Sequence, residues 1–316
     1  MDVVRSCVSH PIRDSLAVSR ARRTPERALF GEYRATRDSI TPGVKPLLRG
    51  IRRGGMDLDL DGNVALITGS ATGLGHACAE AFSKQGANVA LMSPNLDDLA
   101  YASDRLFAIG DGEIFGLDAD VRQPEQVAAF VDETVEQYGR IDHLVTGPRP
   151  LEPERFLEVS DQDWFRGFDR LFMSVVWTMR ESYGWLESSD YGTVVNVTNP
   201  VIRAFGEEFS VANSFGRAIE GITRTQADAF APDIRVNAVV PGPHETEDME
   251  GFLTELVGNG VYDDPDAAWE AAMSGSPYAS PGDPLALGKL VAFLSSEHAG
   301  FVNGATVPVD GGGSSR

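Results

Sequence analysis

Short apolar runs alternate with longer amphipathic stretches between residues 64 and 309, and this alternation constrains the fold more than any other feature of the chain. The apolar runs, which predict strands, cover residues 64–68, 88–92, 113–118, 143–146, 193–197, 234–240 and 305–309. The amphipathic stretches, which predict helices, cover residues 77–85, 97–109, 123–138, 161–186 (broken near Gly184), 208–230 and 284–296. Strands joined by helices make right-handed crossovers and so form a parallel sheet. We therefore expect an α/β fold, a single domain with a doubly wound parallel sheet of about seven strands covered by helices on both faces.

A glycine-rich segment, TGSATGLG at residues 68–75, joins the first expected strand to the first expected helix. Glycines permit a tight turn and close backbone approach, and the helix N-terminus offers N–H groups and a positive dipole end to a pyrophosphate. A turn needed only for packing is the alternative interpretation. The strand before the loop and the helix after it favour a dinucleotide site. The residues expected to contact the dinucleotide are Gly69, Ser70, Thr72, Gly73, Leu74 and Gly75.

Together with three further motifs, this loop resembles the short-chain dehydrogenase/reductase family, especially its 3-oxoacyl-acyl-carrier-protein reductase branch. The motifs are Asp120-Val121 after the third strand, NAVVPG at 237–242, and FVNG followed by VDGG at 301–312. The resemblance covers residues 58–313 and implies a Rossmann-like domain that uses NAD or NADP. It implies an oxidoreductase acting on a carbonyl or secondary alcohol. It also implies cofactor contacts from Asp120, Val121, Pro241, Gly242 and Thr246.

The choice between NAD and NADP depends on the end of the second strand. In NAD-preferring relatives this strand ends in Asp, which bonds the ribose, whereas NADP-preferring relatives carry a basic residue nearby. Here Ser93, Pro94 and Asn95 stand at this point, so neither preference is indicated. We expect Ser93 to contact the cofactor, and the cofactor to be NAD or NADP.

The catalytic Asn, Ser, Tyr and Lys of the family are all replaced. The matching positions hold Leu171, Asn199, Asn213 and Arg217. An Asn side chain can hydrogen-bond a carbonyl but cannot titrate, and Arg217 stays charged, so it can hold a ribose hydroxyl but not relay protons. The family's standard proton transfer therefore cannot run on these residues, and losing a general acid costs roughly 10²–10⁴ in rate.

His244, in the loop PGPHET at 241–246, is the best replacement for the missing proton donor, because imidazole exchanges protons near neutral pH. A solvated loop histidine is the alternative. Thr198 and Ser214 are hydroxyls beside the vacated positions, but simple packing roles explain them equally well. The expected catalytic residues are Asn199, Asn213, Arg217, which also contacts the cofactor, and His244. No metal site is expected, because two cysteines are too few for a four-ligand zinc site.

Three functions remain open at this point. The first is an NAD(P)-dependent oxidoreductase with an atypical active site. The second is a non-catalytic nucleotide-binding protein or partner subunit, and the third is a fold-sharing enzyme of another reaction type. Residues 248–283 correspond to the family's lid over the substrate, although packing on the sheet or a subunit contact would also explain their aromatic side chains.

Charge divides the chain into two parts. Residues 1–55 hold 12 basic and 5 acidic residues, a net +7, and the remaining residues 56–316 hold 15 basic and 42 acidic residues, a net −27. We expect residues 1–55 to be an extension outside the domain: a disordered arm, a transit-like presequence or, the favoured option, sequence upstream of a true start at Met56. Residues 56–316 form the expected domain. Its acidity and shortage of lysine favour a salt-adapted protein, and ordinary acidity is the alternative.

Composition also limits the partners. The acidic domain disfavours nucleic acid, and no apolar stretch reaches the 18 residues that indicate a membrane span. Few cysteines fit a reducing cytoplasm. The expected partners are a small-molecule substrate and further copies of the chain, because the resemblance implies a dimer or tetramer built on residues 161–186 and 208–230.

Overall fold

The computed structural model describes residues 32–35, 56–147, 155–198, 209–278 and 280–313. The strands are β1 (Glu32–Ala35), β2 (Val64–Ile67), β3 (Asn88–Ser93), β4 (Ile114–Asp118), β5 (His143–Thr146), β6 (Thr193–Val197), β7 (Arg235–Pro241) and β8 (Thr306–Val309). The α-helices are α1 (Gly73–Lys84), α2 (Leu96–Ile109), α3 (Pro124–Tyr138), α4 (Asp161–Gly167), α5 (Ser174–Glu187), α6 (Ser210–Phe230), α7 (Glu247–Gly258), α8 (Pro265–Met273) and α9 (Pro284–Ser295).

The strands form one sheet in the order β1-β4-β3-β2-β5-β6-β7-β8. Strands β2 to β8 pair in parallel, which confirms the predicted doubly wound sheet. Strand β1 pairs antiparallel with β4, from Glu32 opposite Leu117 to Ala35 opposite Ile114. The sequence analysis did not predict β1, which lies within the basic residues 1–55 and has no regular apolar pattern. From β2 the chain adds β3 and β4 on one side, and then crosses to β5 on the other side of β2. A crevice therefore opens between β2 and β5 at their carboxyl ends.

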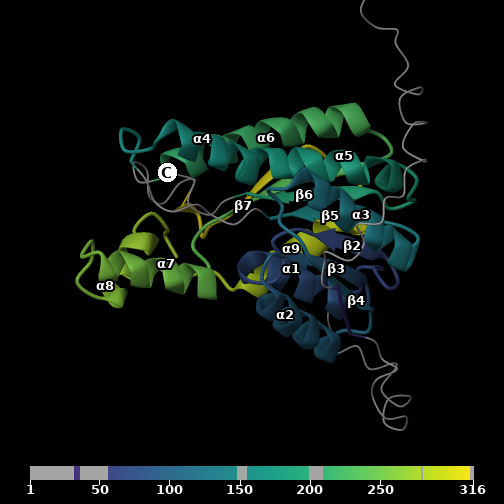
Figure 1. Ribbon diagram of the computed structural model, residues 1–316, viewed down its shortest axis with the longest axis horizontal. Coiled ribbons are helices and arrows are strands. Elements are labelled where there is room, and N and C mark those ends of the chain that lie inside the picture. Colours follow the sequence, from purple (N-terminus) through teal and green to yellow (C-terminus); the bar gives the residue numbers. More distant parts are fainter. Residues whose placement is uncertain (1–31, 36–55, 148–154, 199–208, 279, 314–316) are drawn as a thin grey trace, which may run out of the picture. The chain divides into compact units, whose positions relative to one another are not determined.

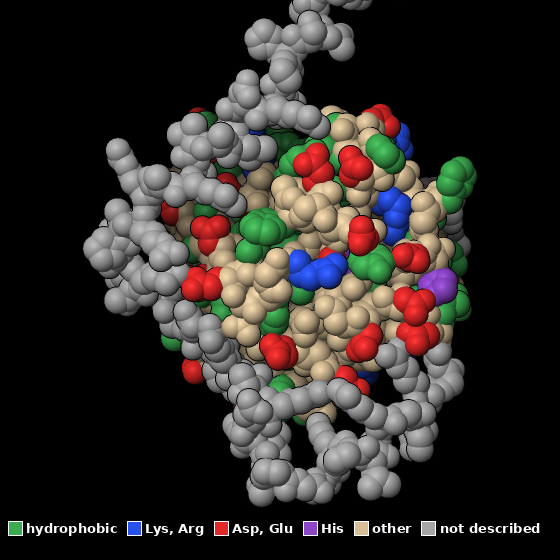
Figure 2. Space-filling model, turned by 90° about the vertical axis from the view of Figure 1, so that its right-hand side faces the viewer, with side chains coloured by type: hydrophobic (Ala, Val, Ile, Leu, Met, Phe, Trp, Pro, Cys, Tyr) green, Lys and Arg blue, Asp and Glu red, His purple; other side chains and the backbone are tan. Residues whose placement is uncertain are grey.

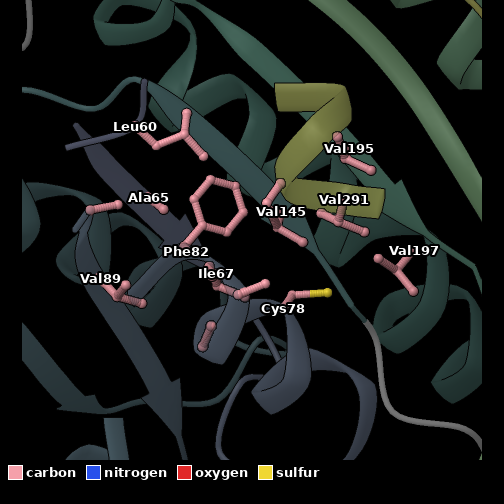
Figure 3. Packing of buried hydrophobic residues seen from close by; sticks show 14 of the residues in the cluster. Leu60, Ala65, Ile67, Cys78, Phe82, Val89, Val145, Val195, Val197 and Val291 are labelled. Carbon is pink, nitrogen blue, oxygen red and sulfur yellow. The ribbon is translucent and has the colours of Figure 1, made fainter. Parts of the chain in front are cut away.

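Helices cover both faces of the sheet (Figure 1). On one face α1, α2 and α9 enclose an apolar cluster in which Phe82 and Val291 pack against Val145 and Val195 of the strands (Figure 3). On the other face α3, α5 and α6 enclose a second cluster that includes Phe130. Full burial of one phenylalanine stabilises the fold by about 1.5–3 kcal/mol. The two clusters therefore hold the strands in place, and the ends of these strands carry the site.

The helix expected over residues 161–186 is interrupted, but not where the sequence predicted. A π-helical segment, η4 (Phe168–Met173), separates α4 from α5, whereas Gly184 lies inside α5. The predicted break at Gly184 was wrong, because a single glycine weakens a helix by only about 1 kcal/mol and packing overrides this preference. Within η4, Leu171 is buried. Such π-bulges often occur at functional sites, and this one holds Leu171, the position that the resemblance matches to the family's catalytic Asn.

Helices α7 and α8 follow β7 and pack on each other. Their shared cluster contains Leu253 and Leu256 of α7 and Ala268 and Ala272 of α8. This pair forms the segment predicted as a lid, and its apolar residues build a small cluster of their own. Figure 1 shows α7 and α8 beyond the end of the sheet, on the side where β7 ends.

Acidic side chains are spread over the surface shown in Figure 2, with few basic side chains between them. This distribution agrees with the net charge of −20 for the whole chain. Among the residues that the structure describes, no helix is long and apolar enough to cross a membrane.

Candidate dinucleotide-binding and active site

The glycine-rich loop lies at the carboxyl end of β2, beside β5, and its glycines are required by geometry. Gly69 has φ +61° and Gly73 has φ +57°, values in the left-handed region that glycine favours. A Cβ at Gly69 would collide with the Gly147 carbonyl oxygen, and one at Gly75 would collide with the carbonyl oxygen of Gly69. We call Gly69, Thr72, Gly73 and Gly75 the phosphate cradle. No residue larger than glycine fits at Gly69 or Gly75, as expected where a pyrophosphate must approach the backbone closely.

Two of the loop residues predicted to contact the cofactor also have structural contacts of their own. Ser70 is fully buried, donates through Oγ to the Ile67 carbonyl oxygen at 2.8 Å and accepts from the Met92 N–H at 3.3 Å. It therefore ties the loop to β2 and β3. Leu74 packs against the apolar cluster beneath the loop. The remaining loop residues surround the start of α1, where first-turn N–H groups have no partner within the helix.

A cavity of about 260 Å³ opens beside the cradle, where β3 and β4 end. Of the predicted cofactor residues, it is lined by Gly69, Thr72, Ser93, Asp120 and Val121. The sequence analysis missed Arg122 and Arg170, which also line it. Arg122 could have been found from its place directly after Asp120-Val121. Arg170 could not, because only the π-helical turn brings it to the cavity.

Asp120 and Arg122 form a charged pair in this cavity. The Arg122 Nε lies 3.0 and 2.8 Å from the two Asp120 carboxylate oxygens, and its Nη2 lies 2.5 Å from Oδ2. Partial burial favours the protonated acid, but hydrogen bonds and the positive charge of Arg122 outweigh it and lower the pKa of Asp120. The pair therefore keeps Asp120 ionised, and the Asp120 carboxylate offsets the positive charge of Arg122.

A second cavity of about 290 Å³ lies on the other side of the cradle, between α1, α2 and the start of α7. It is lined by Thr72, Gly73, His76, Arg105 and Thr246, among others. Thr246 caps α7, because its Oγ1 accepts from the Met249 N–H at 3.1 Å. Burial, and then the nearby Arg105, lower the pKa of His76. The predicted cofactor contact Thr246 thus lies next to the cradle.

Within the described part of the chain, the positions matched to the family's catalytic residues lie in η4 and in the first two turns of α6. Leu171 is buried in an apolar cluster with Phe209 and Ala212. Asn213 is half-buried on the first turn of α6 and its N–H donates to the Phe209 carbonyl oxygen at 2.8 Å. Asn199 lies outside the described residues. This region is therefore more apolar than a site built on Asn, Ser, Tyr and Lys.

Arg217 is exposed and bonds Glu220, one turn further along α6, with Nη1 to Oε1 at 2.9 Å. The neighbouring hydroxyls differ in their environment. Ser214 donates to the Ser210 carbonyl oxygen within α6, an ordinary helical bond. Thr198, at the end of β6, is buried, and within the described part of the chain its Oγ1 has no hydrogen-bond partner. A buried hydroxyl left unpaired costs about 1–3 kcal/mol, which makes Thr198 the better candidate for a substrate contact.

His244 is buried, with 4% of its surface exposed, so it is not a solvated loop residue. Its Nδ1 lies 2.8 Å from the Gly242 carbonyl oxygen, and its backbone bridges to Gly282. Burial lowers the pKa of His244, against the opposing effects of that carbonyl and of Asp283. The ring is therefore neutral near pH 7. Its Nδ1–H donates to the Gly242 carbonyl oxygen, and its Nε2 is left as an acceptor.

Pro241 and Gly242 end β7 beside the C-terminal motif. The Gly242 N–H donates to the Val309 carbonyl oxygen at 2.8 Å, and a Cβ at Gly242 would lie 2.7 Å from the Asp310 Cα. The two motifs that are far apart in sequence therefore meet at one sheet edge. In the part of the chain that the structure describes, no group of three or more His, Cys, Asp or Glu residues could hold a metal ion.

Comparison with known proteins identifies the family. A family model described as enoyl-(acyl carrier protein) reductase matches residues 69–314. The chain belongs to the short-chain dehydrogenase/reductase family. It is 32% identical over 260 residues to oxidoreductase UcpA of Escherichia coli K12, covering 80% of this chain and 95% of that protein. It is 29% identical to 3-oxoacyl-[acyl-carrier-protein] reductase FabG of Thermotoga maritima, covering 80% of this chain and 98% of that protein.

Solved structures of the family superpose on the same region. L-sorbose reductase from Gluconobacter frateurii, complexed with NADPH and L-sorbose, aligns with a TM-score of 0.76 at 28% identity, covering 81% of this chain and 98% of that one. Levodione reductase aligns with a TM-score of 0.75 at 26% identity, covering 81% and 99%. The family supports NAD(P) binding, and the glycines of the cradle, which permit a close approach of the backbone, fit that cofactor.

Proposed function

We propose that this protein is an NAD(P)-dependent oxidoreductase that acts on a carbonyl or secondary alcohol with an altered set of proton-transfer residues. The observation that carries the proposal is the phosphate cradle. Gly69 and Gly73 keep left-handed backbone conformations, and Cβ atoms at Gly69 and Gly75 would collide with backbone. Glycine adopts these conformations readily, and a loop without side chains at these points lets the backbone approach a pyrophosphate closely.

The cofactor is expected to lie across the carboxyl ends of β2 and β5. Its adenosine end would occupy the 260 Å³ cavity with Ser93, Asp120 and Val121, and its pyrophosphate would meet the cradle. Pro241, Gly242 and Thr246 would border the other end. When bound, the cofactor supplies or accepts the hydride. The protein must then hold the substrate oxygen and move one proton.

Four side chains are proposed for these tasks, and Asn199 is a further candidate. The Asn213 amide would hydrogen-bond the substrate oxygen, and Arg217 would hold a ribose hydroxyl after leaving Glu220. The Thr198 hydroxyl, which has no hydrogen-bond partner among the described residues, would position the substrate. His244 would exchange the proton through Nε2, because its Nδ1 already faces the Gly242 carbonyl oxygen.

The named relatives support a small oxygenated substrate. L-sorbose, levodione and 3-oxoacyl groups, named in the relatives' descriptions, all carry a carbonyl. The test mixes the protein with NADH or NADPH and a panel of sugar, ketoacyl and cyclic ketone substrates. Falling absorbance at 340 nm is expected with at least one substrate, and His244→Ala should slow it roughly 10²-fold or more. Constant absorbance with every substrate would reject the enzymatic role.

A non-catalytic nucleotide-binding protein is the second candidate. The cluster around Leu171 and Phe209 favours it, because these apolar side chains occupy the region where relatives carry polar catalytic groups. This candidate predicts NADH or NADPH binding by calorimetry with no turnover. A rate that disappears in His244→Ala would reject it. A fold-sharing enzyme of another reaction type has no specific observation in its favour.

We also propose that the protein works as a homo-oligomer in the cytoplasm. Phe165 of α4 is 70% exposed and Trp185 of α5 is 40% exposed, and both lie in the segment expected to form the subunit contact. Large apolar surfaces on a helix commonly mark such contacts. Light scattering of the purified protein, compared with Phe165→Glu, would give the oligomeric state.

A further inference from the structure

A carboxylate lies on the phosphate cradle. Asp248, in the first turn of α7, accepts from the Thr72 hydroxyl through both oxygens, at 3.4 Å to Oδ1 and 3.2 Å to Oδ2. The same carboxylate lies so close to Gly73 that a Cβ there would collide with it. An anionic group of the protein therefore already occupies the neighbourhood in which the proposed function places the pyrophosphate.

The start of α1 explains why a carboxylate is stable there. The side chain of Thr72, the residue before the helix, makes no capping hydrogen bond to it, and no acidic residue stands in the first turn of α1. The N-terminus of a helix carries about half a positive charge and attracts anions. Asp248 is far from the start of α1 in the sequence. It brings a negative charge to that helix end because α7 packs beside it.

A second contact holds α7 in the same position. Phe252 lies one turn after Asp248, so both side chains leave the same face of the helix. The Phe252 ring packs edge-on against Phe209, with 5.4 Å between ring centroids and 65° between planes. Phe209 directly precedes α6, which carries Asn213 and Arg217. Helix α7 thus touches both the phosphate cradle and the vacated catalytic region.

We propose that α7 is a clasp in which Asp248 competes with the cofactor phosphates for the phosphate cradle. When a dinucleotide binds, either the Asp248 carboxylate moves away or it repels the phosphates. The clasp therefore lowers the affinity for the cofactor and couples its binding to movement of α7. The inference rests on the proposed function only for the identity of the ligand, because the contact between Asp248 and Thr72 is made by residues of this chain.

The test uses Asp248→Asn, which keeps the size of the side chain and removes its charge. Dissociation constants for NADPH and NADH are measured by calorimetry on the full-length protein. Asp248→Asn is expected to bind the preferred dinucleotide about 3- to 30-fold more tightly than the wild type. Glu250→Gln is the matched control, because it removes one charge from an exposed position on the same helix and should change the constant less than twofold. Unchanged or weaker binding by Asp248→Asn would overturn the proposal.

Hydrogen exchange of α7 in the nucleotide-free protein separates this inference from the proposed function. If Asp248 holds α7 down, the amides of residues 247–258 should exchange several-fold faster in Asp248→Asn than in the wild type or Glu250→Gln. If no variant binds a dinucleotide, the proposed function fails, and the exchange rates alone decide on the clasp. Equal exchange in all three proteins would reject it.

Discussion

The Phe252 ring of α7 packs against the Phe209 ring in front of α6, 5.4 Å away between centroids. Phe252 also packs against two apolar clusters, the one around Leu171 and the one inside the α7–α8 pair. It is therefore the side chain that joins the lid to the region of the candidate active site.

This junction gives the first prediction. Phe252→Ala should lower the free energy of unfolding by roughly 1–2 kcal/mol, less than the ~3–5 kcal/mol of a fully buried phenylalanine, because Phe252 is half-buried. Hydrogen exchange in α7 and α8 should increase more than exchange in the sheet. Phe301→Ala, at a fully exposed position, is the control and should leave both quantities nearly unchanged. Equal protection of α7 in wild type and Phe252→Ala would show that the ring contact does not hold the lid.

The second prediction concerns the cradle. Gly69→Ala places a methyl group against the Gly147 carbonyl oxygen and strains a backbone at φ +61°, so it should weaken dinucleotide binding roughly 10- to 100-fold by calorimetry. Gly184→Ala is the control, because a Cβ there meets no atom within 4 Å and the position lies inside a helix. That substitution should stabilise the protein by about 0.5–1 kcal/mol without changing affinity. Normal binding by Gly69→Ala would place the nucleotide elsewhere.

The third prediction uses the Asp120–Arg122 pair. Because Asp120 offsets the Arg122 charge, Asp120→Asn should release a cation into the adenosine cavity and favour the ligand with the extra phosphate. The ratio of NADPH to NADH affinity should rise about 3- to 10-fold at low salt and less at high salt. Asp118→Asn removes a charge two residues before Asp120, at the end of β4, from a side chain that does not line the cavity, and it should leave the ratio unchanged. A constant ratio in Asp120→Asn would mean that Arg122 does not face the 2′-phosphate.

The fourth prediction is a pH dependence of stability that originates far from the cradle, at the opposite end of β5. His143 is fully buried, with Nε2 3.0 Å from Asn63 Nδ2 and Nδ1 2.8 Å from Thr193 Oγ1. Burial lowers its pKa to about 4, against the attraction of Asp142 and with help from Arg235 and Arg140. The unfolded chain therefore binds a proton at higher pH than the folded protein does.

The sign follows from this difference. The contribution of neutral His143 is fully present above about pH 6.5 and is lost as the pH falls toward 4, by up to roughly 3 kcal/mol. Urea unfolding between pH 7.5 and 4.5 should therefore show a steeper loss for the wild type than for His143→Gln. Parallel curves for the two proteins would show that His143 does not stay neutral in the folded state.

Much of the fold was predictable because the strands are local apolar runs. The parallel sheet and its seven expected strands were confirmed, with helix and strand limits shifted by one or two residues in most cases. The segment η4 was not predictable, since a π-helical turn in an amphipathic helix leaves no clear mark in the residue pattern. Strand β1 was also missed, because an edge strand of four residues carries little periodic signal.

The candidate site was predictable in the same uneven way. Loop residues whose role depends on their own backbone, such as Gly69 and Gly73, have the predicted geometry. The surroundings of other residues depend on neighbours that the sequence pattern does not give. Ser70 is buried under the loop, and Arg170 lines the cavity. The catalytic roles of Asn199, Asn213, Arg217 and His244 stay predictions.

The sequence by itself determined the family and the glycine-rich loop, because both depend on short motifs of consecutive residues. Only the tertiary structure decided that Asp248 lies on the cradle, that Phe252 meets Phe209 and that His244 is buried. The physical reason is that α7 contacts Thr72 and Phe209, which lie far from it in the sequence. Its position is fixed by packing and by the charge of a distant helix terminus, and neither can be derived from its own residues.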